Sequence, residues 1–170
     1  MTERSRSMPL GVVVERREID NPWQDHVWRP VSVIAGAGGI AEWREIGAGA
    51  GWVRFHAATL PLDLHRRETE AYRTNLSNNP PLIYVVLTEP EDGERDVEPF
   101  LVTASPFEAQ DYLDSGEDVV EGVPMPDGVI AWVQDFIDKH HVDEPFKKRK
   151  RKRYDPNDTS FGRRPGGRRQ

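Results

Sequence analysis

A glycine-rich pattern is the part of the sequence that comes closest to a known chemical motif. Gly36-x-Gly38-x-x-Ala41 follows an apolar run, as the fingerprint of a dinucleotide-binding site does. In that site the glycines open a helix of about ten residues whose N-terminus holds the pyrophosphate. Only residues 40–46 precede the next glycine-rich stretch here. We therefore expect a turn from Gly36 to Gly39, and we keep an enzyme that handles a nucleotide or a molybdopterin cofactor through this loop as an alternative.

Other residue types that carry out chemistry are present without the spacing that chemistry needs. Two metal ligands on a helix stand three or four residues apart, and on a strand they alternate. No pair among the five histidines does so; they are His26, His56, His65, His140 and His141. The chain has no cysteine and no Gly-x-Ser-x-Gly nucleophile elbow. We predict no catalytic residue, no metal site and no cofactor, and these observations favour a protein that is not an enzyme over one that is.

Charge divides the chain into two parts. Residues 147–170 contain eleven Lys and Arg against two Asp, a net charge of +9 that leaves −15 for residues 1–146. The basic segment is self-repelling and nearly free of large apolar residues, so we expect it to be disordered. It could dock on a protein partner or increase solubility, contact the acidic body, or bind nucleic acid or a membrane. Its candidate docking residues are Lys147, Lys148, Arg149, Lys150, Arg151, Lys152 and Arg153.

A tryptophan-rich loop is the best candidate for a partner-binding surface. The stretch NPWQDHVWRP at residues 21–30 holds two tryptophans between turn-forming residues, and indoles are favoured anchors of protein interfaces. The candidate residues are Trp23, Asp25, His26, Trp28 and Arg29. By contrast, the acidic side chains of residues 111–121 are typical of a solvated surface, because like charges are inexpensive in water.

The elements that must position these residues indicate an α+β fold. The first half of the chain contains β-branched and alternating runs closed by turn formers, which predict a mainly antiparallel sheet. We expect strands over residues 10–14, 31–34, 43–46, 52–60, 82–88 and 100–103, with 82–88 central because it is the most apolar. We expect a flexible segment over residues 1–7, one domain over residues 8–146 and the disordered basic tail over residues 147–170.

About three helices follow from periodicity and capping residues. Ser105 can cap a helix that has Pro106 at its first position and Glu108 to complete a capping box, and Gly116 can end it. A weaker pattern predicts a helix from residue 63 or 64 to Leu76. The last helix, over residues 127–141, is amphipathic, with a stripe that we expect to pack in the core: Val129, Trp132, Val133, Phe136 and Ile137.

Several stretches together resemble a proteobacterial family catalogued as domain of unknown function 3305. They are PLGVVVERR at 9–17, NPW to WRPV over 21–31, EAY to NL over 70–76 and EAQDYLDSGED at 108–118, and the likeness continues through most of residues 8–153. The resemblance brings no catalytic residues. It implies a setting beside molybdenum-dependent formate dehydrogenases and a companion family numbered 3306, and some members carry a label for molybdopterin-guanine dinucleotide biosynthesis.

These features together lead to a functional hypothesis. We expect a non-catalytic accessory or assembly protein that binds a formate dehydrogenase subunit or the companion 3306 protein. A nucleic-acid-binding regulator that uses the basic tail is a further alternative. No apolar run approaches the roughly 18 residues of a membrane span, and no signal peptide opens the chain. We therefore expect a cytoplasmic protein.

Overall fold

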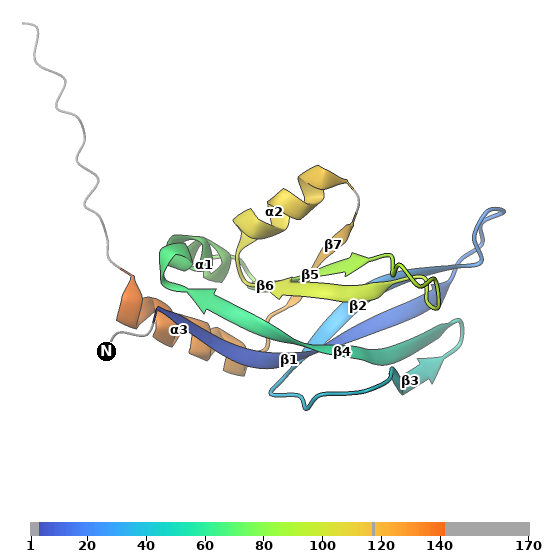
Figure 1. Ribbon diagram of the computed structural model, residues 1–170, viewed down its shortest axis with the longest axis horizontal. Helices are drawn as coiled ribbons and strands as arrows, with labels where there is room; N and C mark the ends of the chain where they lie inside the picture. Colours follow the sequence, from blue (N-terminus) through green and yellow to red (C-terminus); the bar gives the residue numbers. More distant parts are fainter. Residues whose placement is uncertain (1–3, 117, 142–170) are drawn as a thin grey trace, which may run out of the picture.

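The computed structural model describes residues 4–116 and 118–141, which form seven strands, three α-helices and a short 3-10 helix (Figure 1). The α+β class and the number of α-helices agree with the prediction. The basic segment 147–170 lies outside the described residues. The elements are β1 (Ser5–Glu18), β2 (His26–Ala35), β3 (Arg44–Gly49), β4 (Trp52–His65), η1 (Arg66–Glu68), α1 (Thr69–Leu76), β5 (Leu82–Thr88), β6 (Glu98–Thr103), α2 (Pro106–Ser115), β7 (Val119–Pro124) and α3 (Asp127–His140).

The first four strands form one antiparallel sheet in the order β2-β1-β4-β3. Strands β1 and β4 pair over almost their whole length, from Ser5 opposite His65 to Arg17 opposite Trp52. This pairing begins within the segment 1–7 that we expected to be flexible. The register shifts at Ala57 of β4, which has no partner on β1. As a result, the residues of β4 that face the core are odd-numbered up to this bulge and even-numbered after it.

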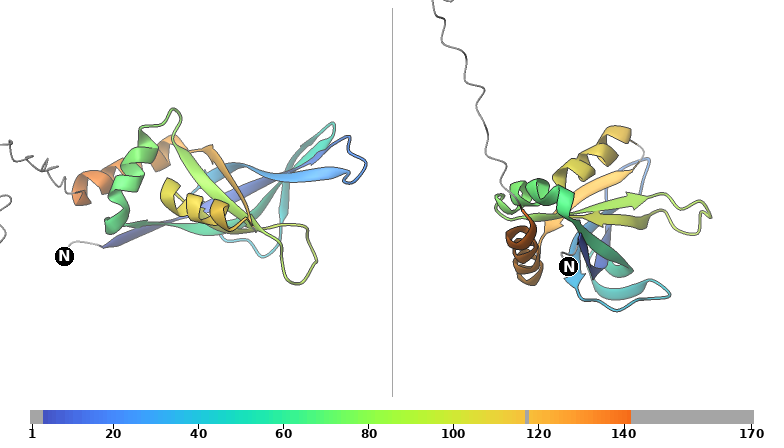
Figure 2. Two further views of the ribbon diagram at one scale, coloured as in Figure 1. Left: turned by 90° about the horizontal axis from the view of Figure 1, so that it is seen from above. Right: turned by 60° about the vertical axis from the view of Figure 1, so that its left-hand side comes forward.

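The second sheet has the order β6-β5-β7 and is also antiparallel. Its most apolar strand, β5, is central, as predicted. Strand β7 was not predicted, because its sequence follows an acidic run and lacks alternation. Strand β4 contacts β6 and β2 contacts β7, so the two sheets pack against one another (Figure 2).

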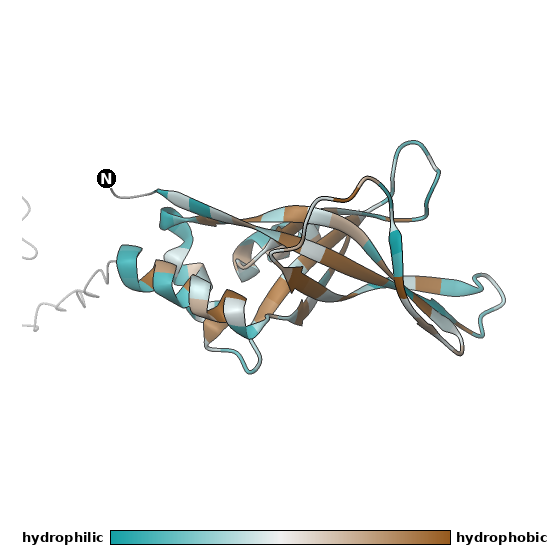
Figure 3. Cartoon of the chain, turned by 90° about the horizontal axis from the view of Figure 1, so that it is seen from below, coloured by the Kyte–Doolittle hydropathy of each residue, from teal (hydrophilic) through white to brown (hydrophobic). Residues whose placement is uncertain are grey.

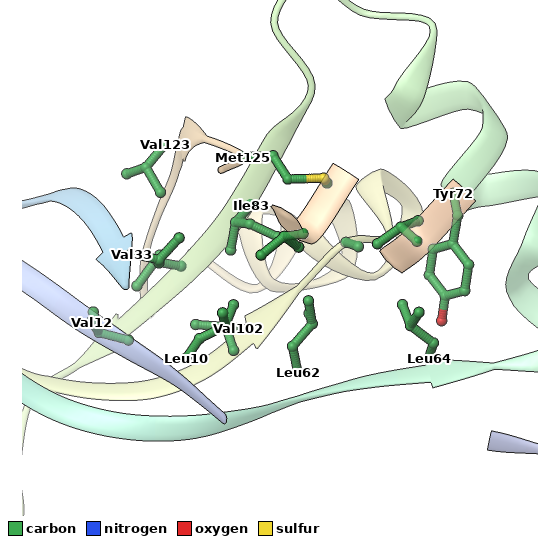
Figure 4. Packing of buried hydrophobic residues seen from close by; sticks show 14 of the residues in the cluster. Leu10, Val12, Val33, Leu62, Leu64, Tyr72, Ile83, Val102, Val123 and Met125 are labelled. Carbon is green, nitrogen blue, oxygen red and sulfur yellow. The ribbon is translucent and has the colours of Figure 1, made fainter. Parts of the chain in front are cut away.

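The hydrophobic core fills the space between the sheets. Alternate residues of β1 and β5 point into it, among them Leu10, Val12 and Val85, which are completely buried. Figure 4 shows the side chains of both sheets meeting there, and Figure 3 shows that hydrophobic residues occupy the strand centres while hydrophilic residues gather at the hairpin ends and the outer end of α3. Full burial of one such side chain contributes about 1.5–3 kcal/mol.

Helix α2 begins and ends where the sequence predicted. The Ser105 hydroxyl accepts a hydrogen bond from the Glu108 backbone N–H at 3.2 Å, Pro106 occupies the first turn, and Gly116 ends the helix at φ +70°. The expected start of the earlier helix at residue 63 or 64 is wrong. Strand β4 continues to His65, because Leu62 and Leu64 alternate into the core, and α1 begins only at Thr69.

Helix α3 packs with α1 against one end of the two sheets. Val129, Val133, Phe136 and Ile137 are buried in the core, as predicted. Trp132 is the exception, because it lies half-buried at the edge of the core. Among the described residues, no helix is both long enough and apolar enough to cross a membrane.

Candidate functional site

The connection between β1 and β2 presents one tryptophan to solvent. Trp23 is 90% exposed, the largest exposed fraction among the large hydrophobic residues described. Its backbone N–H donates a hydrogen bond to Asn21 Oδ1 at 2.8 Å, and the Ile19 N–H donates to the Asp25 carbonyl at 3.0 Å. These bonds close the turn locally. The indole is therefore displayed on a turn of defined shape.

Behind this tip lies an aromatic cluster, which we define as Trp28, Trp43 and Phe55. The ring centroids are 5.5 Å apart for Trp28 and Trp43, 5.7 Å for Trp43 and Phe55, and 5.9 Å for Trp28 and Phe55. Strand β2, the segment before β3 and strand β4 each supply one ring. Aromatic pairs of this geometry contribute about 0.5–1.5 kcal/mol each beyond the area that they bury. The cluster packs against the main core and extends it toward the hairpins, which it stiffens.

One carboxylate from the β5–β6 loop holds this cluster from the side. The Trp28 indole donates a hydrogen bond from Nε1 to Asp96 Oδ2 at 3.0 Å, and His26 Nε2 lies 3.0 Å from the same oxygen. The guanidinium of Arg95 lies over the Trp43 ring, 4.2 Å from its centroid. The β5–β6 loop, which comes from the second sheet, thereby covers the aromatic face of the first.

His26 lies between two carboxylates. Its Nδ1 is 2.6 Å from Asp25 Oδ1, while its Nε2 faces Asp96. The hydrogen bond with Asp96, supported by the bond with Asp25 and the charges of both carboxylates, raises the pKa of His26 above its ordinary value of 6.5 against the opposing effect of burial. The hydrogen bonds from His26 and Trp28 lower the pKa of Asp96. The arrangement favours an ionised pair that joins the two loops.

On the opposite face of the same strands, a carboxylate is paired with two arginines. Glu15 is buried, and it accepts hydrogen bonds from Arg17 and from Arg54, with the two Nε atoms each 3.2 Å from a carboxylate oxygen. Burial alone would raise the pKa of Glu15, but the two guanidiniums outweigh it and the pKa is lowered. Arg54 also lies over the Trp52 ring, 4.8 Å from its centroid. Both faces of the hairpin base are therefore anchored by side chains.

The structure separates the five partner-binding residues that we inferred from the sequence. Trp23 and Asp25 lie exposed at the tip. Trp28 belongs to the aromatic cluster behind it, and both Trp28 and His26 contact Asp96. Arg29 points to the other face of β2, where its Nε donates to Glu121 Oε2 of β7 at 3.2 Å. The seven basic residues 147–153 lie outside the described residues.

Four residues that anchor the hairpin base belong to no candidate site that we predicted from the sequence: Trp43, Phe55, Arg95 and Asp96. The two aromatic residues were assigned to strands, and no local pattern shows that their rings meet Trp28. Asp96 lies in the acidic segment 89–98, and no local pattern distinguishes it from the other acidic residues there. Its partners lie 68 and 70 residues away in the chain, so no spacing rule could have connected them.

The glycine loop has no helix after it. The chain passes from β2 to β3 without one, so a dinucleotide fold is not formed around Gly36 and Gly38. The Gly36 N–H donates to the Pro9 carbonyl at 2.9 Å, and the Gly38 carbonyl accepts from the Thr59 hydroxyl at 2.6 Å. Gly36 has φ +70°, as a tight turn requires. These glycines make a turn that is fastened to the sheet.

Within residues 4–116 and 118–141, no group of three or more acidic or histidine side chains has the geometry of a metal site. What the hairpin end can do chemically is present a rigid indole beside charged groups.

Comparison with protein-family models places this architecture. The chain matches, over residues 9–150, the model of a family described as protein of unknown function (DUF3305). The chain belongs to this family. No curated protein and no solved structure matches it significantly. The match to DUF3305 spans both sheets apart from residues 5–8 of β1, all three helices and the whole β1–β2 tip, so the hairpin and its aromatic cluster lie within the family's domain.

Proposed function

We propose that this DUF3305 protein is a non-catalytic accessory or assembly protein of the cytoplasm that acts by binding another protein through the tip of the β1–β2 hairpin. The observation that carries the proposal is the 90% exposure of Trp23 on an anchored turn. A large apolar side chain that is exposed in the free protein contributes strongly to the binding free energy when a partner buries it. Because the turn is already ordered, binding costs little further conformational entropy.

The aromatic cluster and its contact with Asp96 support this role for Trp23. Trp28, Trp43 and Phe55 pack against one end of the core, and together with Asp96 they fasten the hairpin base. A hairpin that served only to connect two strands would not need such fastening. Side chains that immobilise a loop are expected where the loop has to present a defined surface.

The identity of the partner in this proposal rests on the family resemblance. Its implied setting is a molybdenum-dependent formate dehydrogenase and the companion family numbered 3306. We therefore propose that the partner is a subunit of that enzyme or the 3306 protein during assembly of the enzyme. The docking surface on the partner would be an apolar pocket that takes the indole, with cationic groups at its rim to face Asp20 and Asp25, which flank Trp23 in the chain.

A binding experiment with purified proteins tests the proposal. The full chain is titrated against the formate dehydrogenase subunits and the 3306 protein by calorimetry, and the same titration is repeated with Trp23→Ala. Loss of an interface tryptophan costs about 2 kcal/mol or more at a hot spot, so the affinity should fall at least about tenfold. Phe107→Ala is the matched control, because Phe107 is also exposed, at 57%, but lies on α2.

Two results would contradict the proposal. One is the absence of binding to any of these proteins by the unmodified chain. The other is binding that Trp23→Ala and Phe107→Ala weaken equally, because the tip would then have no special part. If removal of residues 147–170 abolishes binding while Trp23→Ala has no effect, the basic tail docks in place of the hairpin.

A further inference from the structure

A hollow of about 1090 Å³ lies at the end of the molecule opposite the β1–β2 tip. The start of β1, the turn from β4 into α1 and the end of α3 enclose it, and Figure 1 shows these segments together at one end. The Arg66 N–H donates a hydrogen bond to the Arg4 carbonyl at 2.9 Å, which brings two arginines of distant sequence side by side. Thr69 Oγ1 lies 2.9 Å from His141 Nδ1, which joins α1 to the end of α3.

Three arginines that line this hollow are exposed and unpaired. The side chains of Arg4, Arg66 and Arg67 make no ion pair or hydrogen bond within the part of the chain that the structure describes. Four other arginines pair with carboxylates, in Arg6–Asp135, Arg17–Glu15, Arg54–Glu15 and Arg29–Glu121, whereas Arg16 and Arg44, outside the hollow, are exposed and also make no ion pair among the described residues. Residues 1–146 carry a net charge of −15. What distinguishes Arg4, Arg66 and Arg67 is that all three line one hollow of an otherwise acidic body.

A buried histidine in the wall of the hollow is a second and independent sign of a ligand. His140 is only 8% exposed, and its Nδ1 has no hydrogen-bond partner among the described residues. Its ring lies against Phe136, with centroids 4.6 Å apart. Folded proteins rarely leave a buried polar atom unpaired.

We propose that this hollow binds an anion with two or more phosphate groups, held by Arg4, Arg66 and Arg67 beside His140. Guanidinium groups form paired hydrogen bonds to phosphate oxygens in a fixed planar geometry. Glu68 and Glu70 also line the hollow, so a singly charged anion would gain little there. The Tyr72 hydroxyl donates a hydrogen bond to Glu68 Oε2 at 3.1 Å, so the carboxylate of Glu68 is partly directed toward the protein. A hollow of this size accommodates a nucleotide as well as a bare pyrophosphate.

Calorimetric titration of the full chain with pyrophosphate tests the site. The double variant Arg66→Ala, Arg67→Ala should weaken saturable binding at least about tenfold, because two charge-assisted contacts are lost. The matched control is Arg16→Ala, Arg44→Ala, which removes the same charge from two exposed arginines outside the hollow. The control should bind pyrophosphate as the unmodified chain does. All four side chains are exposed, so both variants should keep the circular dichroism spectrum of the unmodified chain.

A nuclear magnetic resonance titration gives a second readout. Pyrophosphate should shift the imidazole signals of His140 and leave the indole signal of Trp52, at the opposite end, in place. Titrations with GTP and CTP distinguish the source of the phosphate groups: equal affinity for all three ligands indicates recognition of phosphates alone, and tighter nucleotide binding indicates contacts to the base or sugar as well. The proposal is overturned if the unmodified chain shows no saturable binding, or if Arg66→Ala, Arg67→Ala binds as well as the control, as it would if the basic tail held the anion.

Discussion

Asn75 provides the sharpest test of how the helices are joined to the sheets. Its side chain is completely buried at the end of α1. Its Nδ2 donates to the Leu82 carbonyl at 2.7 Å and to the Ala104 carbonyl at 2.9 Å, and its Oδ1 accepts from the Leu82 N–H at 2.9 Å. One amide thereby joins α1 to the first residue of β5 and to the segment between β6 and α2. We predict that Asn75→Ala is among the most destabilising substitutions in the domain.

The size of the effect follows from the three backbone groups that lose their partner. A buried polar group left without a hydrogen bond costs about 1–3 kcal/mol. Water that enters the space vacated by the amide would recover part of this cost. We therefore expect the free energy of unfolding to fall by about 3–5 kcal/mol, which is a large share of the about 5–15 kcal/mol that stabilises a typical domain.

Urea denaturation followed by tryptophan fluorescence measures this change. Asn78→Ala is the matched control, because Asn78 is exposed and its side chain makes no hydrogen bond within the described residues. The control should change stability by less than about 0.5 kcal/mol. A loss below about 1 kcal/mol for Asn75→Ala, with the same dependence on urea as the unmodified chain, would refute the reasoning, because the three backbone groups would then have found other partners at little cost.

Two further predictions concern the core and the hairpin. Phe136→Ala should cost about 3–5 kcal/mol in unfolding free energy and Trp132→Ala only about 1–2 kcal/mol, because Phe136 is fully buried and Trp132 only half-buried; equal losses would contradict this difference. His26 should titrate above 6.5 in a nuclear magnetic resonance experiment, and Asp96→Asn should lower its pKa. Because the folded-state pKa is the raised one, the stabilisation of the hairpin by His26 is complete below about pH 6.5 and disappears as the pH rises through the raised pKa; a stability that increases over that range would contradict the assignment.

Local patterns in the sequence predicted the features that depend on neighbouring residues. The capping residues Ser105 and Gly116 located both ends of α2, and apolar composition identified β5 as a central strand. Features that depend on tertiary contacts were not predictable in this way. Strand β4 continues to His65 because its last residues pair with the beginning of β1. Strand β7 forms because Val123 and its neighbours pair with β5 and not because of any alternation of their own.

The same distinction explains the outcome for the candidate site. Trp23 and Trp28 stand five residues apart in one loop-like stretch, and composition alone suggested a single surface. The structure separates the two side chains. Trp28 lies in strand β2, packs in the aromatic cluster and donates a hydrogen bond to Asp96, whereas Trp23 lies in solvent. The arginines of the hollow were not recognised at all. Arg4 and Arg66 are 62 positions apart, and only the pairing of β1 with β4 brings them together.

The pairing of β1 with β4 also accounts for why the molecule has two distinct ends. These two strands are longer than any of the other five, so they extend past the second sheet in both directions. At one end the extension carries the hairpin tip and needs the aromatic cluster and Asp96 to hold it. At the other end it is covered by α1 and α3, and the hollow there takes Arg4 from the residue before β1, Arg66 and Arg67 from η1, and His140 from the end of α3. The hydrophobic core lies between the ends, with the aromatic cluster packed against it at one end and His140 packed on its residue Phe136 at the other. The two sites that we propose lie at opposite ends of one domain, which is the arrangement that an adaptor for two different ligands requires.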